Sequence, residues 1–93
     1  MALLDLLGRR WALRVVWELR EGPLIFRSLQ ARCAGMSSSV LNQRLRELRA
    51  AGVLESGPDG YTLTADGEEL LAHLGPLNDW AERWARSGGE VQA

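Results

Sequence analysis

Residues 35–52 read GMSSSVLNQRLRELRAAG, and this stretch decides the fold. Within it, Leu41, Leu45 and Leu48 recur at the i, i+4 and i+7 spacing that places apolar side chains on one face of a helix. The pattern predicts an amphipathic helix over about residues 38–51. The polar and basic side chains between the leucines fall largely on the opposite face.

The segments next to this helix predict a helix-turn-helix. Ser37 is a favourable N-cap, because its side chain can accept a hydrogen bond from the first turn, and Gly52 is a suitable terminator. Residues 27–33 form a shorter predicted helix, and residues 34–36 form a tight, Gly-bearing turn between the two. Two helices joined in this way are the arrangement of a helix-turn-helix motif.

Toward the N-terminus, one more helix and a short strand are predicted. Apolar residues recur near helical spacing over residues 9–20. Gly22 and Pro23 end this helix, because proline disfavours helical backbone at the residue before it. The apolar residues 24–26 that follow are long enough for a short strand.

Toward the C-terminus, the sequence predicts a hairpin directly after the helix-turn-helix. Residues 53–55 and 61–63 are short β candidates. The sequence GPDG at residues 57–60 is a strong turn signal, because proline presets φ and glycine relaxes it. A hairpin in this place corresponds to the wing of a winged helix.

Two further helices are predicted after the hairpin. Thr64 can cap the first of them. Gly75 and Pro76 should break or kink it, because proline lacks an N–H and clashes with the preceding turn. The last helix is predicted over residues 77–86.

The elements together predict a mainly α fold with a small β-hairpin, a winged helix-turn-helix. The 93 residues are one domain's worth of chain. We expect residues 1–88 to form a single domain, with residues 89–93 as a flexible C-terminal tail.

Charge is distributed unevenly along the chain, although the net charge is only −1. Residues 9–49 carry nine arginines and three acidic residues, whereas residues 50–93 carry two arginines and eight acidic residues. Such asymmetry is a hint of contact with nucleic acid. Every cation is arginine, which suits bidentate phosphate and base contacts and is also what a GC-rich genome would produce.

The polar face of the 38–51 helix is the candidate DNA-binding surface, because the first residues of a helix in the major groove reach base edges. Arginines beside it would contact phosphates, which position a protein without specifying sequence. The alternative is an ordinary solvated helix face. The predicted DNA-binding residues are Arg27, Ser37, Ser38, Ser39, Asn42, Gln43, Arg44, Arg46 and Arg49.

Two of these predictions leave alternatives open. Arg44 lies beside the leucine stripe, where it would contact a phosphate or pair internally with Glu47 or another acid. The wing carries Asp59 and no cation, so we expect a structural hairpin that does not enter the minor groove; the alternative is a contact of its backbone N–H groups with a phosphate.

Several ordered motifs between residues 5 and 84 resemble those of the HxlR-type winged helix-turn-helix transcriptional regulators of the MarR-like superfamily. LGRRW (7–11) resembles hGGKW, WELREGPLIF (17–26) resembles LWxLxxGPxRF, GMSSSVLNQRLREL (35–48) resembles GISxxxLTQRLREL, YTLTADG (61–67) resembles YxLTxxG, and DW (79–80) resembles a later DW. The resemblance implies a bacterial transcriptional regulator that binds double-stranded DNA as a homodimer through its terminal helices.

The chain departs from the family pattern in three places. Residues 1–7 lack the redox-active cysteine that family members often carry before the first helix. The wing is shorter and less basic than usual. Arg27 stands where the family usually has a capping Ser or Asn.

Apolar residues near both ends predict a dimer interface. Trp80 and Trp84 lie on one face of the last helix, and a small domain rarely hides such a face by itself. The alternative is an intramolecular core. The predicted interface residues are Leu3, Leu4, Leu7, Leu77, Trp80 and Trp84.

Other classes of function have little support in the sequence. Cys33 and His73 are the chain's single cysteine and histidine, too few for a disulfide or a zinc site, and we read Cys33 as a core residue. No catalytic motif and no cofactor motif is present, so we expect no enzyme.

No signal peptide or apolar run of membrane length is found, which favours a cytoplasmic protein. A protein-interaction module or a sensor of an unidentified small-molecule effector remains the alternative to a DNA-binding regulator.

Overall fold

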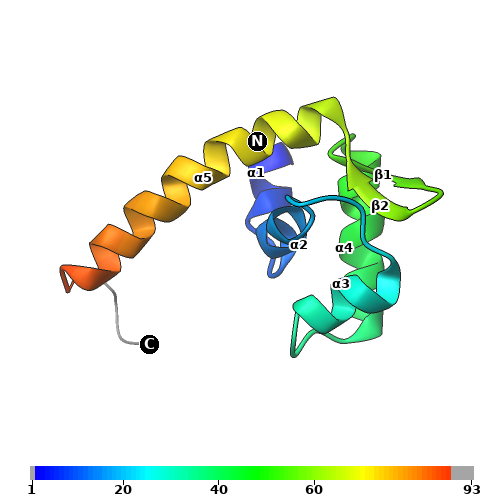
Figure 1. Ribbon diagram of the computed structural model, residues 1–93, viewed down its shortest axis with the longest axis horizontal. Coiled ribbons are helices and arrows are strands. Elements are labelled where there is room, and N and C mark those ends of the chain that lie inside the picture. The colour runs from blue at the N-terminus through cyan, green and yellow to red at the C-terminus, as the bar shows by residue number, and fades with distance from the viewer. Residues whose placement is uncertain (1, 89–93) are drawn as a thin grey trace.

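The computed structural model describes the backbone of residues 2–88 and the side chains of residues 5–88. This part of the chain is mostly helical with one antiparallel hairpin, which confirms the predicted winged helix-turn-helix (Figure 1). The elements are α1 (Ala2–Leu7), α2 (Ala12–Glu18), α3 (Phe26–Arg32), α4 (Ser38–Ala50), β1 (Leu54–Gly57), β2 (Gly60–Leu63) and α5 (Ala65–Arg86). The predicted tail, residues 89–93, lies outside the described residues.

The core forms where α2, α3, α4 and the hairpin meet. The predicted stripe of α4 is confirmed, since Leu41 and Leu48 have no exposed surface and Leu45 is 2% exposed. The other buried core residues are Val15, Val16, Leu19, Leu29, Cys33, Met36, Val53, Leu54 and Leu63.

The hairpin is tight and is fixed to the body by a backbone bridge. Its register pairs Leu54 with Leu63 and Gly57 with Gly60. Beyond it, the Leu24 N–H donates to the Tyr61 carbonyl at 3.0 Å, and the Tyr61 N–H donates back at 2.8 Å. The predicted short strand at 24–26 is therefore a single bridge residue. Gly60 fits beside it at φ 116°, where a Cβ would lie 2.4 Å from the Leu24 oxygen.

Thr64 and Gly67 fix the start of α5. The Thr64 hydroxyl accepts a hydrogen bond from the Gly67 N–H at 3.1 Å, which confirms Thr64 as the N-cap. The same hydroxyl donates to the Gly52 carbonyl. Gly67 packs directly on the backbone, since a Cβ there would lie 2.0 Å from the Val53 oxygen.

The predicted break at Gly75 and Pro76 is wrong, because α5 continues through both as one helix of 22 residues. Proline removes one backbone hydrogen bond, to the carbonyl of Ala72 four residues earlier. Ala72 is exposed, so water can satisfy that carbonyl. The N-terminal apolar stretch, for which no helix was predicted, forms α1.

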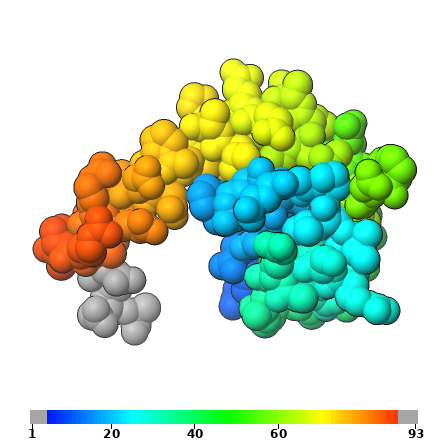
Figure 2. Space-filling view, in the orientation of Figure 1, coloured from blue at the N-terminus to red at the C-terminus, as the bar shows by residue number. Residues whose placement is uncertain are grey.

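The continuous α5 gives the molecule an extended shape of 43 × 27 × 27 Å. Its first half lies over α1 and α2, and its second half projects away from the rest of the protein (Figure 1). We call this second half, residues 77–86, the arm, and residues 9–74 the body. Figure 2 shows open space between the arm and the body. No helix in the described part is long and apolar enough to span a membrane.

Candidate nucleic-acid interface

Helix α4 presents one continuous polar face. The side of the helix opposite the buried leucines is exposed along its whole length. The predicted DNA-binding residues that lie on it are Ser38, Ser39, Asn42, Gln43, Arg46 and Arg49, all of them exposed. The structure therefore brings together the short polar groups at the start of α4 and two arginines farther along it.

Hydrogen bonds from α3 hold the start of α4 in place. Ser37 caps the helix by accepting from the Val40 N–H at 3.2 Å, as predicted, and its Oγ lies 3.3 Å from that of Ser39. Gln30 of α3 donates from Nε2 to the Ser38 hydroxyl at 3.0 Å. Sequence reasoning missed Gln30, which joins the two helices of the motif across the turn.

Most arginines of the basic half are engaged within the protein. Glu18 pairs with Arg14 at 2.7 Å and with Arg32 at 3.9 Å. The guanidinium carbon of Arg20 lies 4.4 Å from the centroid of the Trp17 ring. The guanidinium groups of these arginines therefore already have partners within the protein when no nucleic acid is bound.

Three arginines of the basic half differ from the others there. Among the arginines of residues 9–49, Arg27, Arg46 and Arg49 are the exposed ones whose side chains make no ion pair, hydrogen bond or contact with an aromatic ring in the described part of the chain. Arg27 lies at the start of α3, and the other two lie on the polar face of α4. These three are the arginines for which the sequence predicted a DNA contact without an internal ion pair as the alternative. Their charges are available to an anion.

Arg44 takes the internal alternative. Its guanidinium pairs with the Glu47 carboxylate, and its Nε donates to the Arg10 carbonyl at 3.0 Å. The side chain is only 14% exposed. The geometry of Arg44 therefore does not support the alternative in which this side chain contacts a phosphate.

The wing is short and acidic. Only two residues, Pro58 and Asp59, separate the paired ends of its strands. Arg46 and Arg49 border a shallow groove against β1, and the groove also contains Glu55. The hairpin itself has no cation, as the sequence indicates.

The arm carries an apolar face that the body does not cover. Leu77 is 53% exposed, Trp80 52% and Trp84 38%. The two indole rings stack on each other, with centroids 6.1 Å apart and planes 15° apart. These side chains are therefore not part of a core within the chain. Leu7 is half-buried, and the side chains of Leu3 and Leu4 lie outside what the structure describes.

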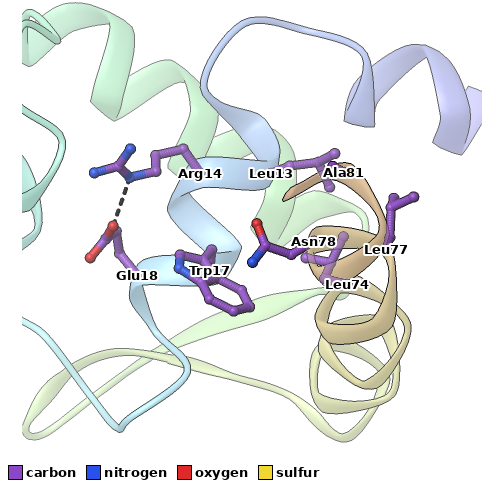
Figure 3. A pocket seen from close by; sticks show the side chains of 8 residues that line it. All are labelled: Leu13, Arg14, Trp17, Glu18, Leu74, Leu77, Asn78 and Ala81. Carbon is purple, nitrogen blue, oxygen red and sulfur yellow. Dashed lines mark hydrogen bonds and ion pairs between the residues drawn. The ribbon is translucent and has the colours of Figure 1, made fainter. Parts of the chain in front are cut away.

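A cavity of about 470 Å³ lies between α2 and α5 (Figure 3). Trp17 and Leu13 form its wall on α2, and Asn78 extends toward them from α5, whereas Leu77 borders the cavity with its side chain directed away from α2. The remaining lining residues are Arg14, Glu18, Leu74 and Ala81. Most of the lining residues are apolar, and the polar ones come from both helices, Arg14 and Glu18 from α2 and Asn78 from α5.

Cys33 is fully buried in the core, as expected. Burial raises the pKa of its thiol above the ordinary value, and the nearby Glu18 carboxylate raises this pKa further, while Arg14 opposes the shift. The thiol is therefore held neutral. His73 is exposed on α5.

Comparison with known proteins explains this arrangement. The model of the HxlR-like helix-turn-helix family matches residues 6–88. The chain belongs to the HxlR-like helix-turn-helix family. The family consists of DNA-binding transcriptional regulators, so an exposed polar helix beside unpaired arginines is the surface expected of a member.

Two regulators of Bacillus subtilis are similar to this HxlR-family chain over most of their length. YvaP, an uncharacterized HTH-type transcriptional regulator, is 33% identical over 86% of this chain and 81% of its own. YodB, an HTH-type transcriptional regulator, is 30% identical over 94% of this chain and 84% of its own. The crystal structure of quinone-bound YodB superposes with a TM-score of 0.81, covering 88% of this chain and 93% of that one.

Proposed function

We propose that this HxlR-family regulator binds its operator as a homodimer, with α4 in the major groove. One observation carries the proposal: the exposed face of α4 combines short polar side chains with arginines that have no partner in the described chain. Asn42 and Gln43 suit adenine edges, and Arg46 suits guanine or a phosphate. Arg27 and Arg49 suit phosphates at the sides of the groove.

The exposed face of the arm supports the dimer. Trp80 and Trp84 leave a large apolar area in solvent, and aromatic residues are enriched in interface cores. A two-fold dimer through the terminal helices would place two copies of α4 about 34 Å apart, one turn of DNA. Each copy would then bind one half of a palindromic site.

The test is fluorescence anisotropy with the DNA upstream of the protein's own gene, beside a scrambled duplex and across a salt series. We expect preference for the native duplex and a steep loss of affinity with salt, because neutralised phosphates release counterions. Arg46→Ala should weaken binding by about 1–3 kcal/mol, since it removes a contact of the recognition helix.

Arg86→Ala is the matched control, because Arg86 is an exposed arginine at the end of the arm, away from α4. It should leave affinity unchanged. Circular dichroism should show both variants folded, because Arg46 lies opposite the buried leucine stripe. Equal affinity of both variants, or no binding by the wild type at low salt, would instead favour a protein-interaction module.

A second candidate function is sensing of a small effector in the cavity between α2 and α5. Its volume and its mostly apolar lining are those of an ordinary ligand site. The structure of YodB with a bound quinone shows that this relative binds a small molecule. An effector in this cavity would touch both the body and the arm, so it would act on the spacing of the two α4 helices.

A further inference from the structure

Helix α4 carries two charged residues that face the junction between α1 and α2. Arg44 and Glu47 lie one turn apart and pair with each other, with 14% and 22% of their side chains exposed. From there, Arg44 Nε donates to the carbonyl oxygen of Arg10, 34 residues earlier in the chain. This bond joins α4 to the segment just before α2.

Glu47 makes a second connection to the same junction. Its other carboxylate oxygen lies 3.5 Å from a terminal guanidinium nitrogen of Arg9. Glu47 therefore bridges Arg44 and Arg9, and Arg44 in turn reaches the Arg10 backbone. We call these four contacting groups the α4 clamp: the side chains of Arg9, Arg44 and Glu47 and the carbonyl of Arg10.

The junction that the clamp holds has an unfavourable backbone conformation. Trp11, the N-cap of α2, has φ 77° and ψ −11°, and among the described residues it is the only one other than glycine with positive φ. This conformation is a genuine outlier for a bulky residue, and it persists only where surrounding contacts determine it. The bond from Arg44 to the carbonyl just before Trp11 is one such contact.

We propose that Arg44 and Glu47 are positioning residues for DNA recognition, which fix the angle of α4 against the α1–α2 junction. The inference rests on the proposed function and adds how the DNA-binding surface is held. The exposed residues of α4 meet base edges only if the helix lies at one orientation in the groove. Because the clamp ties α4 to the junction, it adds a polar restraint on that orientation to the packing of the buried leucine stripe.

The arrangement separates two kinds of arginine on one helix. Arg46 and Arg49 extend from the exposed face and have no partner among residues 5–88. Arg44 instead donates its hydrogen bonds to a carboxylate and a backbone carbonyl within the protein. Loss of Arg44 should therefore affect sequence discrimination, whereas loss of Arg49 should affect the electrostatic part of binding.

The experiment compares Arg44→Gln with Arg49→Gln by anisotropy on the native and scrambled duplexes across a salt series. Arg49→Gln should reduce the slope of log affinity against log salt by about 1 and weaken both duplexes alike. Arg44→Gln should keep the wild-type slope and lower the preference for the native duplex by about tenfold, the scale of one lost base contact. Arg9→Gln should act in the same direction but more weakly, because its contact is long and half exposed.

Hydrogen exchange of the protein without DNA measures the clamp independently. Arg44→Gln should speed exchange over residues 9–13 while Arg49→Gln leaves it unchanged, and thermal melts should show every variant folded at the assay temperature. A salt slope lowered by about 1 in Arg44→Gln would identify a phosphate contact and overturn the inference. An unchanged preference, or unchanged exchange, would also overturn it. Wild-type protein that binds neither duplex would refute the proposed function, and the positioning role with it, even if the exchange data showed the clamp.

Discussion

The body and the arm differ in how far they bury their apolar side chains. In the body, Leu41 and Leu48 of α4 have no exposed surface. In the arm, Leu77 and Trp80 are about half exposed, at 53% and 52%. Both regions are amphipathic helix, so the difference lies in what each helix packs against rather than in its own pattern.

Helix α5 contains both a part that packs on the core and a part whose apolar side chains are exposed. Its first turn is fixed on the body through Gly67, which has no room for a side chain beside the Val53 carbonyl. Farther along, Leu70 and Leu74 are half-buried against the core. Past Pro76, Leu77, Asn78 and Ala81 still border the cavity against α2, and the end of the helix then projects away from the body (Figure 1). The body therefore contains its own core, whereas the apolar face of the arm is left exposed by the described chain and would be covered only in the proposed dimer.

The same substitution in the two regions should give the largest contrast. Leu48→Ala should lower the free energy of unfolding by about 2–5 kcal/mol, because it removes a fully buried side chain and leaves a cavity. Leu77→Ala should lower it by less, because half of that side chain is already in solvent. Urea denaturation at one fixed protein concentration measures both. Equal losses would mean that the arm is as much a part of the core as α4.

The leucine stripe and the helix caps could be predicted from sequence because they depend on nearby residues. Leu41, Leu45 and Leu48 repeat within two turns, and Ser37 is bonded three residues ahead, to Val40. Thr64 was found in the same way. Local spacing determines these features, and the structure confirms each of them.

The features that the sequence did not predict depend on distant contacts. Helix α5 continues through Pro76, where the residue whose carbonyl loses its partner, Ala72, is exposed, and the presence of a proline alone does not reveal this. The partner of Arg44 could not be chosen, because its hydrogen bond reaches back to Arg10. Sequence spacing likewise gave no sign of the left-handed backbone at Trp11.

A substitution in the arm should separate assembly from folding. Trp80→Ala should weaken the proposed dimer by about 2 kcal/mol or more, as truncation of a central aromatic residue often does, while the body stays folded. Sedimentation equilibrium across a concentration series measures the association. Asp79→Asn is the matched control, because Asp79 is the adjacent exposed residue and carries no apolar surface. A wild type that is monomeric at all concentrations would contradict the role given to the arm.

The smallest expected effect comes from Cys33, a titratable group that the body encloses completely. Its raised pKa means that the folded state favours the protonated thiol more than the unfolded state does. The resulting stability is fully present below the unfolded pKa, about 8.5, and is lost as pH rises through the folded pKa. Urea denaturation from pH 7 to pH 10 should therefore show a decline that Cys33→Ala, measured alongside, lacks. If both proteins lose stability equally over this range, the decline comes from other groups and burial of the thiol contributes nothing to it.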